Sequence, residues 1–317
     1  MKVYMNNPNE NWATDRIRAD WYKQKPEIST ENPEEADIIW IAAPWQWLAL
    51  GEELLSSKKV LCTIHHLVPS KFNGQPYAEF VARDRFVDAY HVPNKYTAQF
   101  VSRFTNKPIH IIGYWIDFDS WQPLDKSAAR TALGIEEDKF VIGSFQRDTE
   151  GSDLVSPKLE KGPDLFCDYV EVYAKENSEK VDGEGKPAPV DTLVLLGGWR
   201  RQYVINRLNE SNIPHLYIEM APEDKLKQMY AACDLYIVSS RHEGGPQALL
   251  EAPAMKVPIV STRMGSAEFL LHHNCIVNIP KTYIPKPHEV QSCYDIVKEY
   301  DLSKHADKYE ELLRSLI

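Results

Sequence analysis

The feature that most restricts the fold of this chain is an alternation of short apolar runs with amphipathic stretches, which continues from end to end. Short apolar runs are typical of buried strands, and the amphipathic stretches between them are typical of crossover helices. The alternation therefore predicts parallel α/β architecture. The first set of expected strands comprises Lys2–Met5, Asp37–Ala42, Lys59–Ile64, Ala89–Val92 and Ile109–Ile112. The second set comprises Phe140–Phe145, Thr192–Leu196, His215–Glu219, Leu235–Val238, Ile259–Ser261 and Cys275–Val277.

The chain has 317 residues, 43% of them hydrophobic, which is enough for two cores. Between the two strand sets, residues 119–125 contain a proline and lack periodicity, as a linker does. We therefore predict a Rossmann-like domain over 1–120, a second over 121–285, and terminal helices over 286–317 that pack back on the first domain. In such folds ligands bind at the carboxyl ends of the strands, so we expect the two sheets to face a shared cleft.

Charge and cysteine content exclude several classes of protein. There are 36 Lys+Arg against 46 Asp+Glu, and the net charge of −10 repels duplex phosphate, so we expect no nucleic-acid partner. The five cysteines form no CxxC pair, which indicates a reducing compartment. The longest apolar stretch, residues 38–50, is shorter than a membrane span, and no signal peptide is apparent. We expect a cytoplasmic protein; association with a membrane surface stays open.

The most informative segment is Ser239–Ala254, SSRHEGGPQALLEAPA, directly after an expected strand. A strand, a glycine-containing turn and a helix expose backbone N–H groups that suit a diphosphate or sugar hydroxyls. Gly244 and Gly245 allow a close backbone approach to a ligand, and Pro246 fits the first turn of the helix.

Glu243 and Glu251 bracket this turn, eight residues apart. Along a loop and a helix their separation is about 10 Å, at roughly 1.5 Å per helical residue. The carboxylates of a glycosidase lie about 5–9.5 Å apart and face across one bond. The spacing therefore favours two glutamates that bind different parts of an elongated ligand over the catalytic pair of a hydrolase.

These residues resemble a known family. Glu243 and Glu251 in EGGPQALLEA, followed by VPIVSTRMGSAEFL, are similar to the donor-binding E-x7-E signature of retaining glycosyltransferase family 4, whose fold is GT-B. Further segments match that domain in order: Ile142–Arg147 (IGSFQR), Lys161–Gly162 (in KGPDLF), Leu193–Gly198 (LVLLGG) and Met229–Ser239 (MYAACDLYIVS). The resemblance covers about residues 125–275.

The resemblance implies roles for these residues in binding the donor. Arg147 and Lys161 would neutralise the donor diphosphate as it leaves, with Lys158 as a competitor for the second role. Glu243 would contact the transferred sugar and Glu251 the ribose. The donor-binding set implied is Arg147, Lys161, Gly198, Glu243, Gly244, Gly245, Pro246, Gln247 and Glu251.

In the first domain, His65 and His66 follow an expected strand and resemble the strand-end histidine of the family, which faces the reacting sugar; His65 is the better match by position. The catalytic residues implied are thus Glu243, His65, Arg147 and Lys161. The acceptor-side candidates are Asn7, His66, Trp45 and Trp47, the tryptophans as stacking faces for a sugar.

The function implied is a retaining glycosyltransferase that moves a sugar from a nucleotide-diphosphate sugar, UDP- or GDP-linked, to a saccharide or glycolipid acceptor without a metal or other cofactor. Asp117-Phe118-Asp119 imitates a metal-binding DxD, but a structural or capping role is favoured at the start of a linker. Two alternatives remain: a nucleotide-sugar epimerase on the same fold, and a non-catalytic protein that binds nucleotide sugars or carbohydrate.

Overall fold

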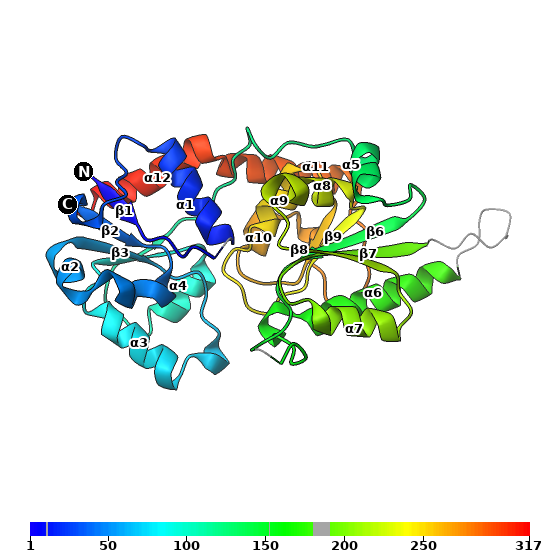
Figure 1. The fold of residues 1–317 in the computed structure, drawn as a ribbon, viewed down its shortest axis with the longest axis horizontal. Helices are drawn as coiled ribbons and strands as arrows, with labels where there is room; N and C mark the ends of the chain where they lie inside the picture. The colour runs from blue at the N-terminus through cyan, green and yellow to red at the C-terminus, as the bar shows by residue number, and fades with distance from the viewer. Residues whose placement is uncertain (11, 152, 180–190) are drawn as a thin grey trace. The chain divides into compact units, whose positions relative to one another are not determined.

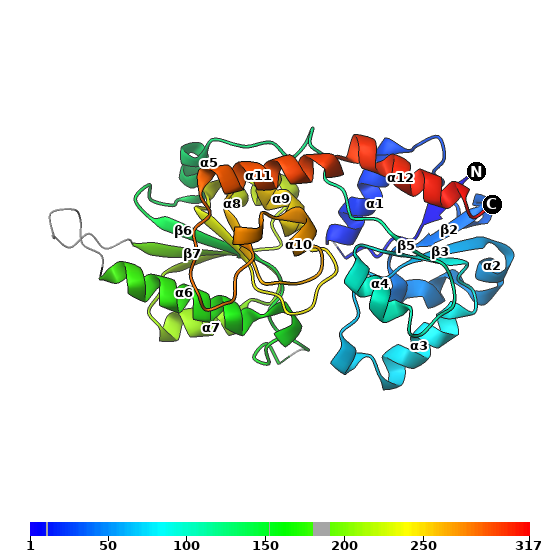
Figure 2. The same ribbon diagram turned by 180° about the vertical axis from the view of Figure 1, so that it is seen from behind.

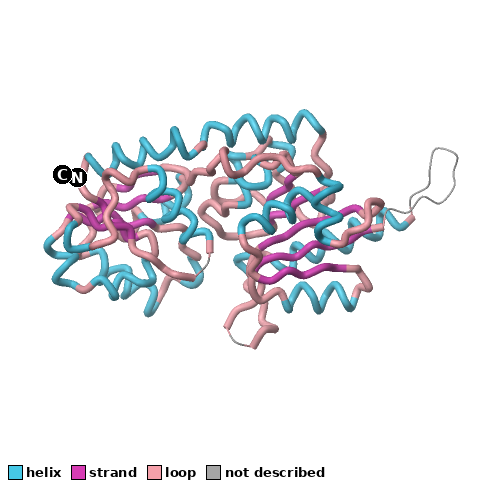
Figure 3. The backbone as a smooth tube through the Cα atoms, turned by 45° about the horizontal axis from the view of Figure 1, so that its top comes forward, coloured by secondary structure: helices cyan, strands magenta, loops and turns pink. Residues whose placement is uncertain are grey.

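The computed structural model describes residues 1–10, 12–151, 153–179 and 191–317. The chain divides into two compact units, which are best described one at a time (Figure 1). The first comprises Met1–Asp117, His242–Gln247 and Glu299–Ile317. The second comprises Phe118–Arg241 and Ala248–Lys298. In each unit helices lie on both sides of a parallel sheet (Figure 3).

The first unit is built on a five-stranded parallel sheet in the order β1-β2-β3-β4-β5. Its strands are β1 (Val3–Met5), β2 (Ile38–Ile41), β3 (Lys59–Thr63), β4 (Ala89–Val92) and β5 (Ile109–Ile111). Its helices are α1 (Ala13–Gln24), α2 (Glu52–Ser57), α3 (Gly74–Asp84), α4 (Lys95–Val101) and α12 (Leu302–Arg314). Helices α1 and α12 cover one face of the sheet, and α2, α3 and α4 lie on the other (Figures 1 and 2).

The alternation of side chains along β2 gives each face of this sheet its own core. Trp40 points to the α1 and α12 side, where its ring lies 5.2 Å from that of Trp21 and 5.4 Å from that of Tyr309. Ile39 and Ile41 point the other way, into the cluster beneath α2, α3 and α4. Both faces are therefore apolar, as a parallel sheet covered on both sides requires.

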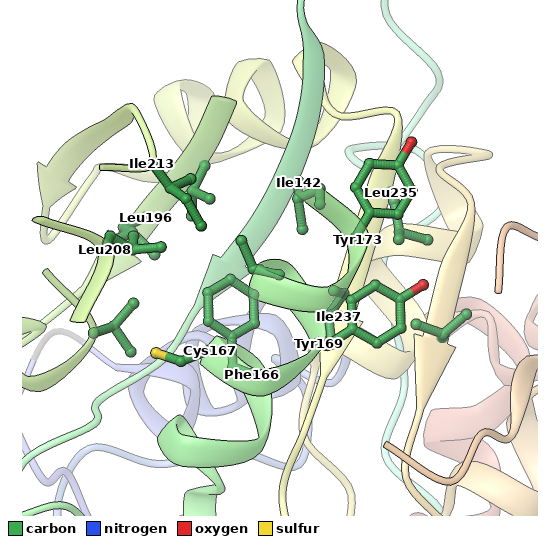
Figure 4. Close-up of a cluster of buried hydrophobic side chains, with 14 of the residues drawn as sticks. Ile142, Phe166, Cys167, Tyr169, Tyr173, Leu196, Leu208, Ile213, Leu235 and Ile237 are labelled. Atoms are coloured by element: carbon green, nitrogen blue, oxygen red, sulfur yellow. The ribbon is translucent and has the colours of Figure 1, made fainter. Parts of the chain in front are cut away.

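The second unit carries a five-stranded parallel sheet in the order β10-β9-β6-β7-β8. Its strands are β6 (Phe140–Phe145), β7 (Thr192–Gly198), β8 (His215–Glu219), β9 (Leu235–Val238) and β10 (Ile259–Ser261). Its helices are α5 (Lys126–Leu133), α6 (Pro163–Ser178), α7 (Gln202–Glu210), α8 (Glu223–Ala232), α9 (Ala248–Ala254), α10 (Ala267–Leu270) and α11 (Pro287–Val297). Side chains of α6 and α7, among them Phe166 and Leu208, pack on strand residues such as Ile142 and Leu235 (Figure 4).

Ten of the predicted strands are present, with boundaries that differ by a residue or two. The prediction of a strand at Cys275–Val277 is wrong. This stretch follows the tight turn His273–Cys275 and makes a single bridge, between Ile276 and Ser261, because the turn leaves too short an extended run for a ladder.

The C-terminal helices divide between the two units. We predicted that the whole of 286–317 packs on the first domain, whereas α11 belongs to the second unit, where it contacts α9. Helix α12 contacts α1 of the first unit, and Lys25 at the end of α1 pairs with Glu310 at 2.7 Å. No helix in the described part of the chain is both long and apolar enough to cross a membrane.

Candidate functional site

The order of the second sheet points to the edge at which a ligand binds. The chain runs outward from β6 through β7 to β8 and then returns to the other side of β6 with β9 and β10. In open α/β sheets ligands bind where the strand order reverses, outside the carboxyl ends of the strands. Gln146 and Arg147 follow β6 at this edge, Trp199 follows β7, and Ser239 follows β9.

Lys161 and Gly162 lie at this reversal. The carbonyl oxygen of Lys161 accepts hydrogen bonds from the Gln146 side chain at 3.0 Å and from the Ser239 hydroxyl at 3.4 Å. Gly162 has φ +63°, and a Cβ there would lie 1.9 Å from the Ser239 carbonyl oxygen, so only glycine fits. The 16-residue helix α6 begins directly after Gly162, which brings the positive end of its dipole to the edge where β6 and β9 end.

Arg147 is half-buried beside this edge. Its Nε donates to the Thr149 carbonyl at 2.8 Å, and its Cζ lies 5.2 Å from the ring centroid of Trp199. Burial and then the neighbouring Arg200 lower the pKa of Arg147, but a guanidinium stays charged at neutral pH. Lys158, the alternative cation, lies 3.8 Å from Glu160 and is therefore part of an ion pair.

Glu251 is buried in the first turn of α9 and is 4% exposed. The Tyr230 hydroxyl, from α8, donates a hydrogen bond of 2.7 Å to its Oε2. Burial and the Glu251 carboxylate raise the pKa of Tyr230 well above its ordinary value, so the phenol keeps its proton and remains a donor. Pro246 lies before α9 rather than in its first turn, because the helix begins at Ala248.

Glu243 and its neighbours belong to the first compact unit. Oε2 of Glu243 lies 3.6 Å from Nδ1 of His66, and the Glu243 side chain is 9% exposed. A Cβ on Gly244 would lie 1.6 Å from the His65 carbonyl oxygen, and the Gly244 carbonyl accepts a hydrogen bond of 2.6 Å from Asn94. The close approach at Gly244 is therefore made to the chain itself rather than left open for a ligand. Gly245, Pro246 and Gln247 continue this segment and are half-buried.

Both ring nitrogens of His65 make contacts within the first unit. Nε2 lies 2.7 Å from the Ala42 carbonyl, and Nδ1 lies 2.5 Å from the Tyr114 hydroxyl. Because a carbonyl only accepts, Nε2 of His65 carries a proton. Of the two histidines, His66 is the one whose ring nitrogen the structure places beside the Glu243 carboxylate.

The acceptor-side candidates differ in exposure. Asn7 is exposed, and its Oδ1 accepts from the Asn9 amide at 3.1 Å. Trp45 is 49% exposed, and its ring centroid lies 5.9 Å from that of His65. The prediction for Trp47 is wrong: it is 4% exposed and packs on Phe86 in the core, so it has no face to offer an acceptor.

The DxD-like segment of the sequence begins at Asp117. Asp117, the first residue of the DxD-like segment, pairs with Lys23 at 2.9 Å. Among the described residues there is no group of three or more His, Cys, Asp or Glu side chains placed to hold a metal ion.

Sequence reasoning missed Tyr230, Asn94 and Arg200 as parts of these surroundings. Arg200 could have been found, because it follows the Gly197–Gly198 pair closely in the segment GGWRR. Tyr230 lies in the matched segment Met229–Ser239, but neither that segment nor the surroundings of Asn94 indicate the distant residue that each one contacts.

Part of the chain matches a known family of proteins. Residues 160–289 match the family model described as "Glycosyl transferases group 1". This part of the chain is similar to that family. It includes Lys161, Gly198, Glu243 and Glu251, although Arg147 lies outside it.

A curated relative is the lipopolysaccharide core biosynthesis mannosyltransferase LpsB of Rhizobium meliloti, 25% identical over 171 residues. The match covers 51% of this chain and 43% of LpsB, so it spans less than half the length of that relative.

Among solved structures, Anabaena Alr3699/HepE in complex with UDP and glucose has a TM-score of 0.75 at 14% identity, with 99% of both chains covered. Sucrose-phosphate synthase of Thermosynechococcus elongatus has a TM-score of 0.65 at 12% identity, covering 95% of this chain and 77% of that one. At these identities the likeness is one of fold: two Rossmann-like α/β domains, as in GT-B glycosyltransferases.

Proposed function

We propose that this chain is a glycosyltransferase that moves a sugar from a nucleotide-diphosphate sugar to a hydroxyl of a saccharide or glycolipid. The match of residues 160–289 to glycosyl transferases group 1 carries the proposal, because it spans Lys161, Glu243 and Glu251. HepE was solved with UDP and with UDP-glucose, which makes UDP the first nucleotide to test.

The chemistry needs a means of stabilising the departing nucleoside diphosphate. In the proposal the guanidinium of Arg147 and the ammonium of Lys161 neutralise its charge, so no metal ion is needed. The N-terminus of α6 adds partial positive charge at the same edge. Glu251 accepts hydrogen bonds from the ribose hydroxyls, and the Tyr230 hydroxyl holds its carboxylate in place.

In the same proposal Glu243 contacts the transferred sugar. His65, whose ring nitrogens contact the Ala42 carbonyl and the Tyr114 hydroxyl, has to exchange one of these contacts to hydrogen-bond the sugar. The backbone N–H groups of Gly245 and Gln247 and the backbone around Gly198 contribute to the donor site. The reaction retains the anomeric configuration, as the E-x7-E resemblance implies, and no side chain acts as a covalent nucleophile.

The test is calorimetric titration of the full chain with UDP, GDP, ADP, dTDP and CMP, with and without EDTA. We expect one nucleotide to bind, EDTA to have no effect, and Glu251→Ala to abolish the binding. Glu311→Ala, which removes an exposed carboxylate from α12, is the matched control and should bind as the wild type does.

With the nucleotide known, the matching nucleotide sugar is incubated with simple saccharides, and the anomer formed is read by proton NMR. A product with the anomeric configuration of the donor is expected. Binding of none of the nucleotides would overturn the donor-site assignment, and an inverted product would overturn retention alone.

A further inference from the structure

Three residues outside the implied donor set lie around Arg147: Trp199, Arg200 and Thr149. Thr149 belongs to the loop after β6 and contacts both arginines. The Cζ of Arg200 lies 4.0 Å from the ring centroid of Trp199, and the Cζ of Arg147 lies 5.2 Å from the same centroid. Two guanidinium groups thus share one indole, an arrangement that cation–π attraction favours. We call the two arginines and the indole the Arg147–Trp199–Arg200 cluster.

The backbone places this cluster under strain. Gly198 has φ +90° and Arg200 has φ +58°, so the chain passes through the left-handed region on both sides of Trp199. For a residue with a Cβ such as Arg200 this conformation is unfavourable, and it persists where the surrounding structure imposes it. The indole that the turn presents is 37% exposed.

Hydrogen bonds fix both arginines to the loop after β6. Arg147 Nε donates to the Thr149 carbonyl, and Arg200 Nη1 donates to the Gly151 carbonyl. The Arg200 carbonyl in turn accepts from the Thr149 hydroxyl at 3.2 Å. Both arginines are therefore tied to the same loop.

The cluster brings two positive charges together. Burial and then the proximity of Arg200 lower the pKa of Arg147, while the carboxylates of Glu150 and Glu160 act in the opposite direction. An anion that bridges two neighbouring guanidinium groups forms charge-assisted hydrogen bonds with both and stabilises the pair. The distance between the two Cζ atoms cannot exceed the sum of their distances to the Trp199 centroid, 5.2 Å and 4.0 Å. A diphosphate with a hydrogen bond at each end can span that distance.

We infer that Arg200 is a third cationic ligand for the donor's diphosphate, held on Trp199 beside Arg147; this inference rests on the proposed function. The charges match the reaction. A sugar diphosphate carries about two negative charges, and the free nucleoside diphosphate carries about three, since a terminal phosphate has a second pKa near 6. Arg147 and Lys161 balance the first state, and Arg200 balances the charge that appears when the glycosidic bond to the diphosphate breaks.

The experiment titrates UDP, UDP-glucose and inorganic pyrophosphate into the full chain at two salt concentrations. Arg200→Gln should lower the affinity for UDP and for pyrophosphate by roughly tenfold or more, the usual effect of losing a charge-assisted hydrogen bond. It should lower the affinity for UDP-glucose less, and reduce the salt dependence of UDP binding. Arg103→Gln is the matched control, because Arg103 also lies over an aromatic ring, 5.5 Å from that of Phe100, in the first unit.

Arg200→Lys separates charge from structure. It keeps the cation but loses the planar group that bonds Gly151, so it should keep most of the pyrophosphate affinity. Equal losses in Arg200→Lys and Arg200→Gln would assign Arg200 to holding the loop and overturn the inference. Wild-type affinity for UDP and pyrophosphate in Arg200→Gln would overturn it and leave the proposed function intact. Pyrophosphate binding that depends on Arg200, with no nucleotide bound, would support the anion site and contradict the proposed function.

Discussion

At the scale of single residues, the pairing of Tyr230 with Glu251 is the contact most open to test. Glu251 is 4% exposed and accepts a hydrogen bond of 2.7 Å from Tyr230. Removal of one partner of a buried charged group costs about 1–3 kcal/mol, because the group left behind stays desolvated. We expect Tyr230→Phe to lower the free energy of unfolding by that amount and to weaken binding of the nucleotide that the chain prefers.

Urea unfolding and nucleotide titration measure the two effects. Tyr77→Phe removes a hydroxyl from a tyrosine that is 44% exposed, so it should leave both quantities unchanged. Wild-type stability and affinity in Tyr230→Phe would show that Glu251 does not depend on this hydrogen bond.

Residue identity and spacing are enough to single out Glu243, Glu251, Arg147 and Lys161, because each lies within a short, recognisable segment of the sequence. The partners of these residues could not be predicted in the same way. The 2.6 Å hydrogen bond from Asn94 to Gly244 joins residues 150 positions apart, and nothing in either segment encodes it. Trp47 shows the opposite failure: its position after a strand suggested an exposed face, and packing against Phe86 buried it.

At the scale of secondary structure elements, the start of α6 depends on one glycine. Gly162 and Gly134 both have left-handed backbones, with φ +63° and φ +70°. A Cβ on Gly134 would meet nothing within 4 Å, whereas one on Gly162 would lie 1.9 Å from the Ser239 carbonyl oxygen. We expect Gly134→Ala to cost about 1 kcal/mol of stability, and Gly162→Ala to cost roughly 2 kcal/mol more.

The free energy of unfolding in urea is measured for both variants. Gly134→Ala reports backbone strain alone, and Gly162→Ala reports the same strain plus the clash with Ser239. Gly162→Ala should also weaken nucleotide binding, because the end of β9 must move to relieve the contact. Equal stabilities of the two variants would mean that the backbone at Ser239 yields without cost.

Helix α11 is anchored at its N-terminus by Glu289, which is 1% exposed. Burial alone would raise the pKa of Glu289, but hydrogen bonds from the Tyr283 hydroxyl, the Asn274 amide and the Lys286 N–H lower it to about 2. A pKa that falls on folding adds stability above the unfolded value, near 4.3, and this stability is lost as the pH falls towards 2.

We therefore expect Glu289→Gln to be less stable than the wild type by about 1–2 kcal/mol at pH 7, with the gap closing between pH 4 and pH 2. The measurement is the free energy of unfolding in urea at several pH values. Glu210→Gln, at an exposed position at the end of α7, should show no pH-dependent gap. A gap for Glu289→Gln that is constant with pH would mean that ionisation of Glu289 does not stabilise α11.

Much of the architecture could be predicted because it depends on a repeating pattern. The alternation of apolar runs and amphipathic stretches predicted eleven strands in two sets, and ten of them are present. The pattern does not predict which of the two units each C-terminal helix packs against. Helices α11 and α12 are both amphipathic, and their contacts with α9 and α1 depend on surfaces distant in sequence.

At the scale of the whole molecule, the two units have cores of their own, so unfolding should show more than one transition. The tryptophans are divided unequally between the units. Those of the first are Trp12, Trp21, Trp40, Trp45, Trp47 and Trp115; those of the second are Trp121 and Trp199. Fluorescence therefore reports mainly on the first unit, whereas far-ultraviolet circular dichroism reports on the helices of both. We expect the urea midpoints from the two probes to differ.

The nucleotide distinguishes the two transitions, because most of the proposed donor contacts, among them Arg147, Lys161 and Glu251, belong to the second unit. At about 100 times its dissociation constant, a ligand stabilises the unit that binds it by roughly 2.7 kcal/mol. The nucleotide should therefore move the circular dichroism transition to higher urea and move the fluorescence transition less. Coincident transitions that shift together would mean that the units unfold as one, since a ligand bound to either then stabilises both. A shift confined to the fluorescence transition would instead assign nucleotide binding to the first unit.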